Sequence, residues 1–334
     1  MLKVSKIIGL STLIIAAIAQ ADTLNSVKDR DLLYCGVSAG LVGFSSIDST
    51  GKWKGVDVDV CRSVAAAVLG DDSKVKYVPL TAKERFTALQ SGEIDILSRN
   101  TTWTLTRDGS LGMNFAGVNY YDGQGFMVKK SLGVSNAGQL DGATFCLQHG
   151  TTTEITLADY FTSHNMSYKS TPSDTSQQTK KGFEAGRCDA ITSDRSQLYA
   201  IRTTLKQPSS AIILPETITK EPLGPSVRHG DDKWFNIVKW SLNAMIGAEE
   251  LGINSDNVNG EFKDPEALRL LGRTGILHKH LSLDKNWAFN IISQVGNYAQ
   301  SFDRNIGKDT PLKISRGLNA LWKDGGILYS PPFR

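Results

Sequence analysis

The sequence lacks an excess of charge of either sign, because 37 Lys and Arg stand against 34 Asp and Glu and the net charge is +3. Without a basic excess there is little to neutralise the phosphates of a nucleic acid, so we expect no nucleic-acid partner. Hydrophobic runs of the ~20 residues that a membrane-spanning helix needs are also missing. The remaining composition, 40% hydrophobic and 21% charged over 334 residues, is globular and predicts two domains.

The longest apolar run lies at the N-terminus, where Lys3 and Lys6 precede residues 7–18. Residues 19–21, Ala-Gln-Ala, offer the small residues that signal peptidase accepts, so the sequence predicts a cleaved signal peptide over residues 1–21. A retained membrane anchor is the alternative, and the shortness of the run disfavours it. No cysteine stands at the cleavage site, which disfavours a lipid anchor. We therefore expect an exported protein.

After this segment, short apolar runs alternate with helical patterns, which is typical of strands joined by crossover helices in a mainly parallel sheet. In a first unit we expect strands at residues 33–37, 75–80 and 94–97. Residues 56–58 are expected to be extended, with Asp59 as the N-cap of the helix that follows. Thr81 and Glu84 have the spacing of a capping box at the start of the next helix.

The same order of elements restarts near residue 140. Strands are expected at residues 144–147, from 168 and at 189–193. Thr151 and Glu154 have the spacing of a second capping box, followed by a helix over residues 155–161, and another helix ends before Gly186. The two units predict an α/β protein of two lobes, each a mainly parallel sheet flanked by helices.

Two passages rich in Gly or Pro, residues 123–128 and 212–225, are interpreted as crossings between the lobes. The expected division is lobe 1 over residues 22–127, lobe 2 over 128–214, and a last part over 215–334. This last part is expected to hold the return crossing, the remainder of lobe 1 and a C-terminal helical extension. Helical periodicity there predicts helices at residues 234–251, 287–298 and 312–322.

The sequence has only four cysteines, Cys35, Cys61, Cys146 and Cys188. An even number in an exported chain predicts disulfides, and three pairings are possible. We favour Cys35 with Cys61 and Cys146 with Cys188, because each bond then lies within one lobe. The alternative is four buried thiols.

A polar segment, residues 98–108, directly follows the strand expected at 94–97, at the sheet edge where open α/β folds bind ligands. A guanidinium group holds a carboxylate through two parallel hydrogen bonds, which makes Arg107 or Arg99 a candidate clamp with Thr102 as a neutral donor beside it. The alternative is a polar surface loop with solvated arginines.

The corresponding edge of the second unit has residues 150–153 before a helix, where unsatisfied backbone amides attract an anion. The alternative is that its threonines only cap the helix. Asp194 follows the last strand of this unit and is placed to pair with an ammonium group, or else to cap the next helix. A guanidinium from one lobe and a carboxylate from the other form a receptor for a zwitterion, and an α-amino acid fits it.

Several stretches also carry a resemblance to a known family: residues 35–38, 43–45, 53–62, 91–104, 186–190 and 316–322. With them the chain resembles the solute-binding proteins of ABC importers for polar amino acids, which have the type II periplasmic-binding-protein fold. It resembles most narrowly their general L-amino acid-binding members. The resemblance covers nearly all of the chain after residue 21. It implies a periplasmic, hinge-bending monomer that binds L-amino acids and docks on an inner-membrane ABC permease.

The resemblance also implies roles for five residues of the site. Arg107 is expected to grip the ligand α-carboxylate, with help from Thr102 and Thr152. Asn100 and Asp194 are expected to take the α-ammonium group, with Asp194 as its charge partner. No cofactor and no metal ion is implied.

Departures from the family pattern bear on the ligand side chain. Relatives strict for acidic amino acids have an Arg where Ser38 stands, and those for basic amino acids have an aromatic residue near Leu41, so the resemblance implies broad specificity. An Asp-Glu pair of the family appears here as residues 174–175, Asp-Thr. Ser38 and Phe44 are candidate pocket residues, although an aromatic residue after the first strand is also typical of a core.

Two other functions share this fold. A dehydratase acting on a carboxylated ring needs a general acid or base, for which His149 and Glu154 are the nearest candidates. The wide spacing of the cysteines and a single close histidine pair, His278 and His280, argue against a zinc site. A sensor for a signalling receptor uses the same binding chemistry as a transport receptor. We expect a binding protein and not an enzyme.

Overall fold

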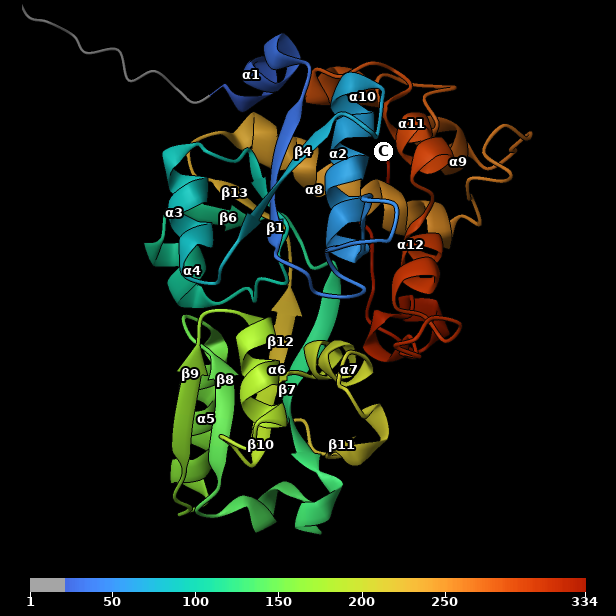
Figure 1. The fold of residues 1–334 in the computed structure, drawn as a ribbon. Coiled ribbons are helices and arrows are strands. Elements are labelled where there is room, and N and C mark those ends of the chain that lie inside the picture. The colour runs from blue at the N-terminus through green and yellow to red at the C-terminus, as the bar shows by residue number, and fades with distance from the viewer. Residues whose placement is uncertain (1–21) are drawn as a thin grey trace, which may run out of the picture.

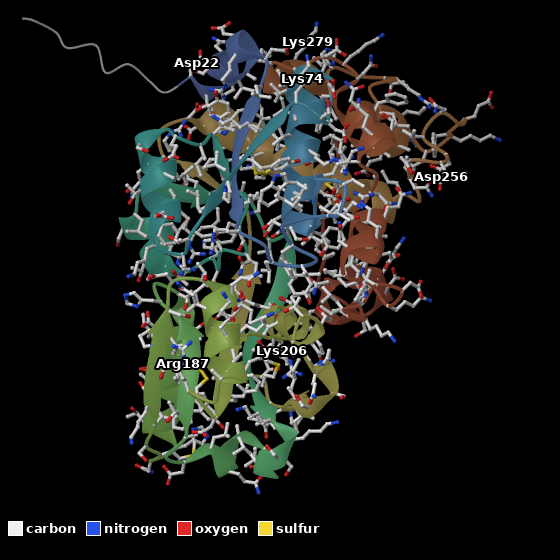
Figure 2. The ribbon with its side chains drawn as sticks, viewed as in Figure 1. Asp22, Lys74, Arg187, Lys206, Asp256 and Lys279 are labelled. Atoms are coloured by element: carbon white, nitrogen blue, oxygen red, sulfur yellow. A yellow bond between two sulfur atoms is a disulfide. The ribbon has the colours of Figure 1, made fainter. Side chains whose placement is uncertain are left out.

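The computed structural model describes residues 22–334, so the predicted signal peptide lies outside the described residues. The chain forms two lobes, one above the other in Figure 1, each built on a sheet with helices packed against it. Exposed charged side chains such as those of Asp256 and Lys279 lie at the periphery (Figure 2). Within residues 22–334 no helix combines the length and the apolarity that crossing a membrane requires.

Lobe 1 has a sheet with the strand order β4-β1-β5-β13-β6. Its strands are β1 (Leu33–Ser38), β4 (Val75–Leu80), β5 (Ile96–Leu97), β6 (Met113–Phe115) and β13 (Ser226–Arg228). A hairpin of β2 (Ser46–Ile47) and β3 (Trp53–Lys54) lies beside it. Four helices precede the first crossing: α1 (Thr23–Arg30), α2 (Val56–Leu69), α3 (Glu84–Ser91) and α4 (Leu105–Ser110).

Helix α2 begins at Val56, earlier than predicted. Its N-cap is Gly55, with a φ of 137°, and a Cβ there would lie 1.9 Å from the carbonyl oxygen of Phe44, so this position requires glycine. Asp59 therefore lies inside the helix, and its carboxylate pairs with Arg304 (2.6 Å). The prediction of Asp59 as the cap was wrong because close backbone packing at Gly55, which sequence spacing does not reveal, fixes where the helix begins.

Of the two predicted capping boxes, one is present. The backbone N–H of Glu84 donates to Thr81 Oγ1 (3.3 Å) and that of Thr81 donates to Glu84 Oε2 (3.0 Å). The box at Thr151 and Glu154 is wrong, because the Thr151 side chain accepts no capping hydrogen bond. Glu154 instead accepts a hydrogen bond from the backbone N–H of Gly150 (2.9 Å).

Lobe 2 has a sheet with the order β11-β7-β10-β8-β9, and β12 also pairs with β7. Its strands are β7 (Tyr120–Lys129), β8 (Thr144–Gln148), β9 (Lys169–Ser173), β10 (Ala190–Asp194), β11 (Ala211–Ile213) and β12 (Thr219–Leu223). Its helices are α5 (Thr152–Ser163), α6 (Ser176–Glu184) and α7 (Arg195–Thr203), with the short 3-10 helices η1 (Lys130–Leu132), η2 (Ala137–Leu140) and η3 (Pro208–Ser210).

Both sheets are mixed, whereas the sequence predicted mainly parallel ones. Strand β1 runs parallel to β4 and β5, and β8 runs parallel to β9 and β10. Strand β7 is antiparallel to β10, β11 and β12, and β13 is antiparallel to β5 and β6. The reason is topological: β7 carries the chain into lobe 2 and β12 carries it back, so these two neighbours run in opposite directions.

The two crossing segments lie against each other where the lobes join. Strand β7 pairs along its length with strands of the lobe 2 sheet, so we place the first crossing just before Tyr120 and not at residues 127–128. The return crossing lies between β12 and β13. A Cβ on Gly224 would lie 2.0 Å from the carbonyl oxygen of Gly117, so the backbones touch at this point. Glycine is required there.

The C-terminal part packs on the outer side of lobe 1, drawn in orange and red in Figure 1. Its helices are α8 (Asp232–Glu250), α9 (Pro265–Leu270), α10 (Leu277–Leu281), α11 (Trp287–Gln294) and α12 (Tyr298–Asn305). The single helix predicted at residues 287–298 is therefore two, because Asn297 caps a new helix and accepts from the Gln300 N–H. The helix predicted at 312–322 is wrong: only η4 (Gly317–Asn319) and η5 (Trp322–Asp324) occur, and Lys313 has a φ of 51° that interrupts a helix.

The C-terminal helices share one hydrophobic core with lobe 1, in which Ile291 of α11 and Val64 of α2 are both fully buried. Polar contacts add to this packing. The carboxylate of Asp59 accepts hydrogen bonds from Ser301 (2.6 Å) and Asn305 (2.7 Å) of α12. Lobe 1 and the extension therefore form one packed unit.

Each lobe contains one disulfide, Cys35–Cys61 in lobe 1 and Cys146–Cys188 in lobe 2. These are the pairs that the sequence favoured. Cys35 lies on β1 and Cys61 on α2, whereas Cys146 lies on β8 and Cys188 just before β10. Neither bond joins the two lobes, so the crosslinks stiffen each lobe and leave their relative movement unrestrained.

Candidate ligand-binding site

The segment that follows β5 is the part of lobe 1 that meets lobe 2. Asp57, in the first turn of α2, accepts hydrogen bonds from the backbone N–H of Asn100 (2.7 Å) and from the side chain of Asn119 (3.0 Å). Asn100 has a φ of 31°, a conformation that asparagine tolerates. Burial raises the pKa of Asp57 to about 6. These bonds fix the backbone of Asn100 at the interlobe contact.

Lobe 1 places three buried guanidinium groups in this region, those of Arg85, Arg99 and Arg107. Arg107 lies on α4, and its Nη1 donates to the carbonyl of Thr102 (2.8 Å). Burial lowers the pKa of each group, that of Arg99 to about 10, yet arginine stays charged in proteins. Among residues 22–334 none of the three forms an ion pair. Buried cations without an ionic partner favour an anionic ligand.

Lobe 2 contributes Asp194, the last residue of β10, which is only 7% exposed. It occupies the N-cap position of α7, yet its side chain makes no capping hydrogen bond. Its Oδ2 lies 3.5 Å from Nδ2 of Asn100, which also donates to Oε1 of Gln197 (3.2 Å). Burial, and then the charges of Asp122 and Glu221, raise the pKa of Asp194 well above its usual range. A ligand ammonium group would relieve this repulsion.

Two acids of the site, Asp122 and the buried Glu221, were missed by sequence reasoning. Asp122 lies on β7 and accepts hydrogen bonds from the hydroxyl and the backbone N–H of Ser196, and burial raises its pKa to about 6. Glu221 lies on β12, and its Oε2 accepts from Thr102 Oγ1 (2.5 Å) and from Thr152 Oγ1 (3.0 Å). The available signal was weak, because Asp122 directly precedes the passage 123–128 and Glu221 shares the passage 212–225 with Glu216.

The structure thus brings five of the seven predicted ligand-binding residues to the place where the lobes meet. Arg107, Asn100 and Thr102 come from lobe 1, and Thr152 and Asp194 come from lobe 2; we call this the interlobe site. Thr152 is the first residue of α5, where backbone N–H groups have no partner within the helix.

The other two predicted residues lie elsewhere in lobe 1. Ser38 is the last residue of β1 and is 9% exposed, and its backbone N–H donates to Ser45 Oγ (3.0 Å). Phe44 is fully buried in the lobe 1 core, with its ring edge-on to that of Tyr120 at 5.4 Å.

The charges of the interlobe site are separated by sign. Lobe 1 contributes the guanidinium groups, whereas lobe 2 and the two crossing strands contribute the carboxylates of Asp122, Asp194 and Glu221. This arrangement can receive a molecule with a carboxylate at one end and an ammonium group at the other. No group of three or more His, Cys, Asp and Glu that could hold a metal ion is present among residues 22–334.

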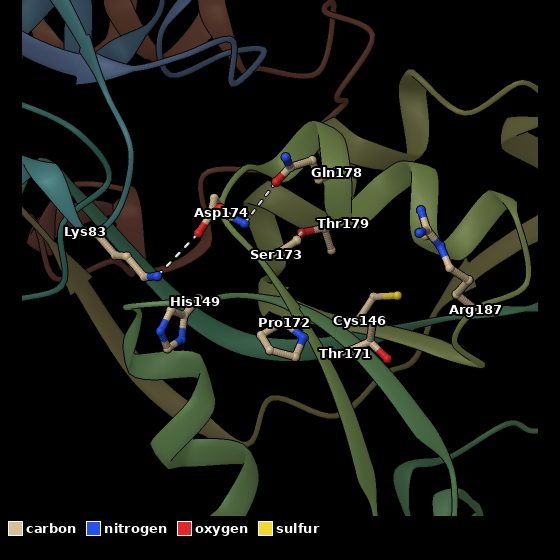
Figure 3. A pocket seen from close by; sticks show the side chains of 11 residues that line it. Lys83, Cys146, His149, Thr171, Pro172, Ser173, Asp174, Gln178, Thr179 and Arg187 are labelled. Atoms are coloured by element: carbon tan, nitrogen blue, oxygen red, sulfur yellow. Dashed lines mark hydrogen bonds and ion pairs between the residues drawn. The ribbon is translucent and has the colours of Figure 1, made fainter.

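A cavity of about 470 Å³ lies on lobe 2 beside the interlobe site (Figure 3). Its walls come from β8, β9 and α6, and Lys83 of lobe 1 reaches across to Asp174, with 3.5 Å between Nζ and Oδ1. Gln148 connects cavity and site, because its Nε2 donates to the carbonyl of Asp174 (3.1 Å) and its Oε1 accepts from Gln197 (3.4 Å). The cavity is polar, with hydroxyl, amide and charged groups.

Comparison with known proteins gives consistent results. Residues 33–256 match the family of bacterial extracellular solute-binding proteins, family 3. The chain is 54% identical over 336 residues to the general L-amino acid-binding periplasmic protein AapJ of Rhizobium johnstonii, covering 99% of this chain and 98% of AapJ. It is 52% identical over 324 residues to the glutamate/glutamine/aspartate/asparagine-binding protein BztA of Rhodobacter capsulatus, covering 96% of each.

A solved structure resembles the chain over most of its length. It is an ABC transporter periplasmic binding protein from Brucella ovis with glutathione bound, 51% identical, with a TM-score of 0.92. The match covers 94% of this chain and 100% of that one. The C-terminal extension is therefore included in the similarity.

Proposed function

The chain belongs to the bacterial extracellular solute-binding proteins of family 3, and from this premise we propose that it captures L-amino acids between its two lobes and delivers them to an ABC transporter. The observation that carries the proposal is the opposition of buried charges, with Arg107 in lobe 1 and Asp194 in lobe 2. The names of the relatives AapJ and BztA support the ligand class. The protein is a binding protein and not an enzyme.

In the proposed complex, Arg107 binds the α-carboxylate of the ligand. The backbone N–H groups at the start of α5 face the same carboxylate from lobe 2, beside Thr102 and Thr152. Asp194 and Asn100 receive the α-ammonium group. Because the recognised groups are common to all amino acids, this geometry favours a broad specificity.

Closure of the lobes gives selectivity for zwitterions. Burying a charge without a partner is costly. When the lobes close around a simple acid or a simple amine, the charge on one of the two lobes is buried without a partner. Only a ligand with both charges stabilises the closed form. A micromolar affinity corresponds to about 8 kcal/mol, which two paired charges and several hydrogen bonds supply after the cost of ordering.

The side-chain preference is proposed to be broad, including acidic and amide side chains. Ser38 stands at the position where relatives specialised for acidic amino acids have an arginine, which argues against such a specialisation. The cavity beside Gln148 gives room for longer ligands, and the relative from Brucella ovis was solved with glutathione bound. We propose that γ-glutamyl compounds of this kind are also ligands.

The family supports a proposal for the cellular setting. We propose that residues 1–21 are a cleaved signal peptide and that the protein acts in the periplasm as a monomer. Its partner is an inner-membrane ABC permease, which recognises the closed form. Delivery to a signalling receptor is the second candidate, since it uses the same closed form. A lyase is disfavoured because the relatives AapJ and BztA are named as amino acid-binding proteins.

Native mass spectrometry of the protein purified without denaturant tests the proposal. We expect an unaltered amino acid or a γ-glutamyl peptide to be released. Calorimetry with a panel of amino acids, their α-amides and glutathione then ranks the ligands. Equal affinity for amino acids and their α-amides would refute recognition of the carboxylate, and turnover of a prephenate-like acid would favour the lyase.

A further inference from the structure

Glu221 is placed where both lobes and the return crossing meet, and it is only 2% exposed. Its Oε2 accepts a hydrogen bond from Thr102 Oγ1 of lobe 1 at 2.5 Å and from Thr152 Oγ1 of lobe 2 at 3.0 Å. A threonine hydroxyl has a single proton to donate. As long as Glu221 accepts both protons, neither hydroxyl can donate to the carboxylate of a ligand.

We infer that Glu221 is an internal carboxylate that competes with the ligand α-carboxylate for the hydroxyl protons of Thr102 and Thr152, and so sets the affinity of the interlobe site. This inference rests on the proposed function, because it requires an amino acid carboxylate beside Arg107. Glu221 is therefore a specificity-determining residue. It weakens the binding of a ligand that has an α-carboxylate, and it does not weaken the binding of a ligand that has a neutral α-amide.

Protonation of Glu221 removes the competition. A protonated carboxyl group no longer repels a second carboxylate, and its own O–H becomes a donor, so the threonine hydroxyls can turn toward the ligand. The proton comes from solvent, and the ligand carboxylate stays ionised. Binding of an amino acid is then accompanied by proton uptake at Glu221.

Three charged groups face Glu221 from the surrounding elements. Arg107 on α4 favours its ionised form. Asp122 on β7 and Asp194 at the end of β10 carry charges of the same sign as Glu221 and disfavour it. Burial has the largest influence and raises the pKa of Glu221. A ligand carboxylate adds one more negative charge at close range, which raises this pKa further.

The substitution Glu221→Gln tests the inference, because glutamine has the same shape and no charge. Calorimetry with L-glutamine from pH 5 to pH 8 gives the ratio of the wild-type Kd to the variant Kd. We expect a ratio near one at the acidic end that rises to about tenfold at the alkaline end, since a shift of one pKa unit on binding corresponds to a tenfold change in affinity. For L-glutamine α-amide we expect no such rise.

The matched control is Glu216→Gln, the same substitution in the same crossing passage at a residue that does not contact Thr102 or Thr152. Its affinity ratio should stay near one at every pH. A Glu221→Gln variant that binds more weakly at all pH values, as expected if Glu221 held the ligand ammonium group, would overturn the inference. A ratio that does not change with pH would also overturn it.

The wild-type protein gives a second readout that does not depend on the folding of a variant. Calorimetry at pH 7 in two buffers of different ionisation enthalpy measures the protons exchanged on binding, and we expect net uptake with L-glutamine that is larger than with its α-amide. Equal proton exchange with both ligands contradicts competition at Glu221. Absence of any amino acid binding by the wild-type protein would instead refute the proposed function itself.

Discussion

The two walls of the interlobe site differ in how their charges are held. On lobe 1, the segment with Asn100 is hydrogen-bonded to Asp57 of α2, and Arg107 is tied to the carbonyl of Thr102. Helix α2 in turn packs against the C-terminal extension. On the other wall, Asp194 ends a lobe 2 strand, while Asp122 and Glu221 belong to the two crossing strands.

The guanidinium wall of the site is therefore preformed within lobe 1, whereas the position of the carboxylates relative to that wall depends on the hinge. The guanidinium groups are fixed within one packed unit, so their geometry changes little as the lobes move. The carboxylates lie on three neighbouring strands of one sheet, in which Glu221 is paired with Asp122, so it is their distance from the guanidinium groups that depends on the angle between the lobes. We infer that the carboxylate end of the ligand binds first and that its ammonium end is completed on closure.

Replacing the preformed anchor is expected to have the largest effect. In Arg107→Ala the ligand carboxylate is buried without its cation, and we expect a loss of roughly 2 to 5 kcal/mol in binding. Calorimetry with L-glutamine measures it. The control is Arg273→Ala, because Arg273 is exposed and belongs to the C-terminal part, outside the interlobe site and the cavity. Unchanged affinity of the Arg107→Ala variant would remove this residue from the proposed site.

A smaller loss of binding free energy is expected from a substitution at Asp194, on the lobe 2 side of the site. In Asp194→Asn the ammonium group keeps a hydrogen-bond acceptor but loses its charge partner, so we expect binding to weaken by roughly 2 kcal/mol. Calorimetry with L-glutamine measures the loss. Asp159→Asn, at an exposed acid on α5 of the same lobe, is the control.

The substitution Asp194→Asn should also stabilise the ligand-free protein against unfolding. The folded-state pKa of Asp194 lies above that of an unfolded aspartate. The folded state therefore keeps this proton to higher pH, and its stability falls as the pH rises from about 4 through the raised pKa. A neutral asparagine side chain at this position carries no such penalty, so the Tm of the Asp194→Asn variant should exceed that of the wild type at pH 8 and match it near pH 4. A lower Tm at pH 8 would contradict the assigned burial of the charge.

How far the sequence predicts this site depends on where the residues lie. Arg107, Asn100 and Asp194 follow strands at a sheet edge, a local pattern that sequence alone displays. Asp122 and Glu221 lie in the crossing strands, and Glu221 is buried where it meets Thr102 and Thr152, which come from two lobes distant along the chain. The local alternation of polar and apolar residues in the sequence does not indicate contacts between such distant segments.

The same contrast holds for the fold. Six strands, β1, β4, β5, β8, β9 and β10, and the two disulfides were predicted because each belongs to one lobe and depends on nearby chain, whereas β6 and β13 were not predicted. The start of α2 was missed because it is set by the approach of Gly55 to Phe44. The predicted sheets were too parallel, because the antiparallel neighbours arise from the two crossings and not from local repeats.

The smallest effect is expected at the edge of the contact between the lobes. Lys83 and Asp174 form an ion pair across it at 3.5 Å, with side chains 53% and 62% exposed. Exposed pairs contribute little, so Lys83→Ala should weaken L-glutamine binding by less than about fivefold. Because water and ions screen this pair, the difference from wild type should disappear at about 1 M salt, where the Debye length is ~3 Å. A larger effect that persists in salt would mean that closure depends on this exposed edge as much as on the buried charges.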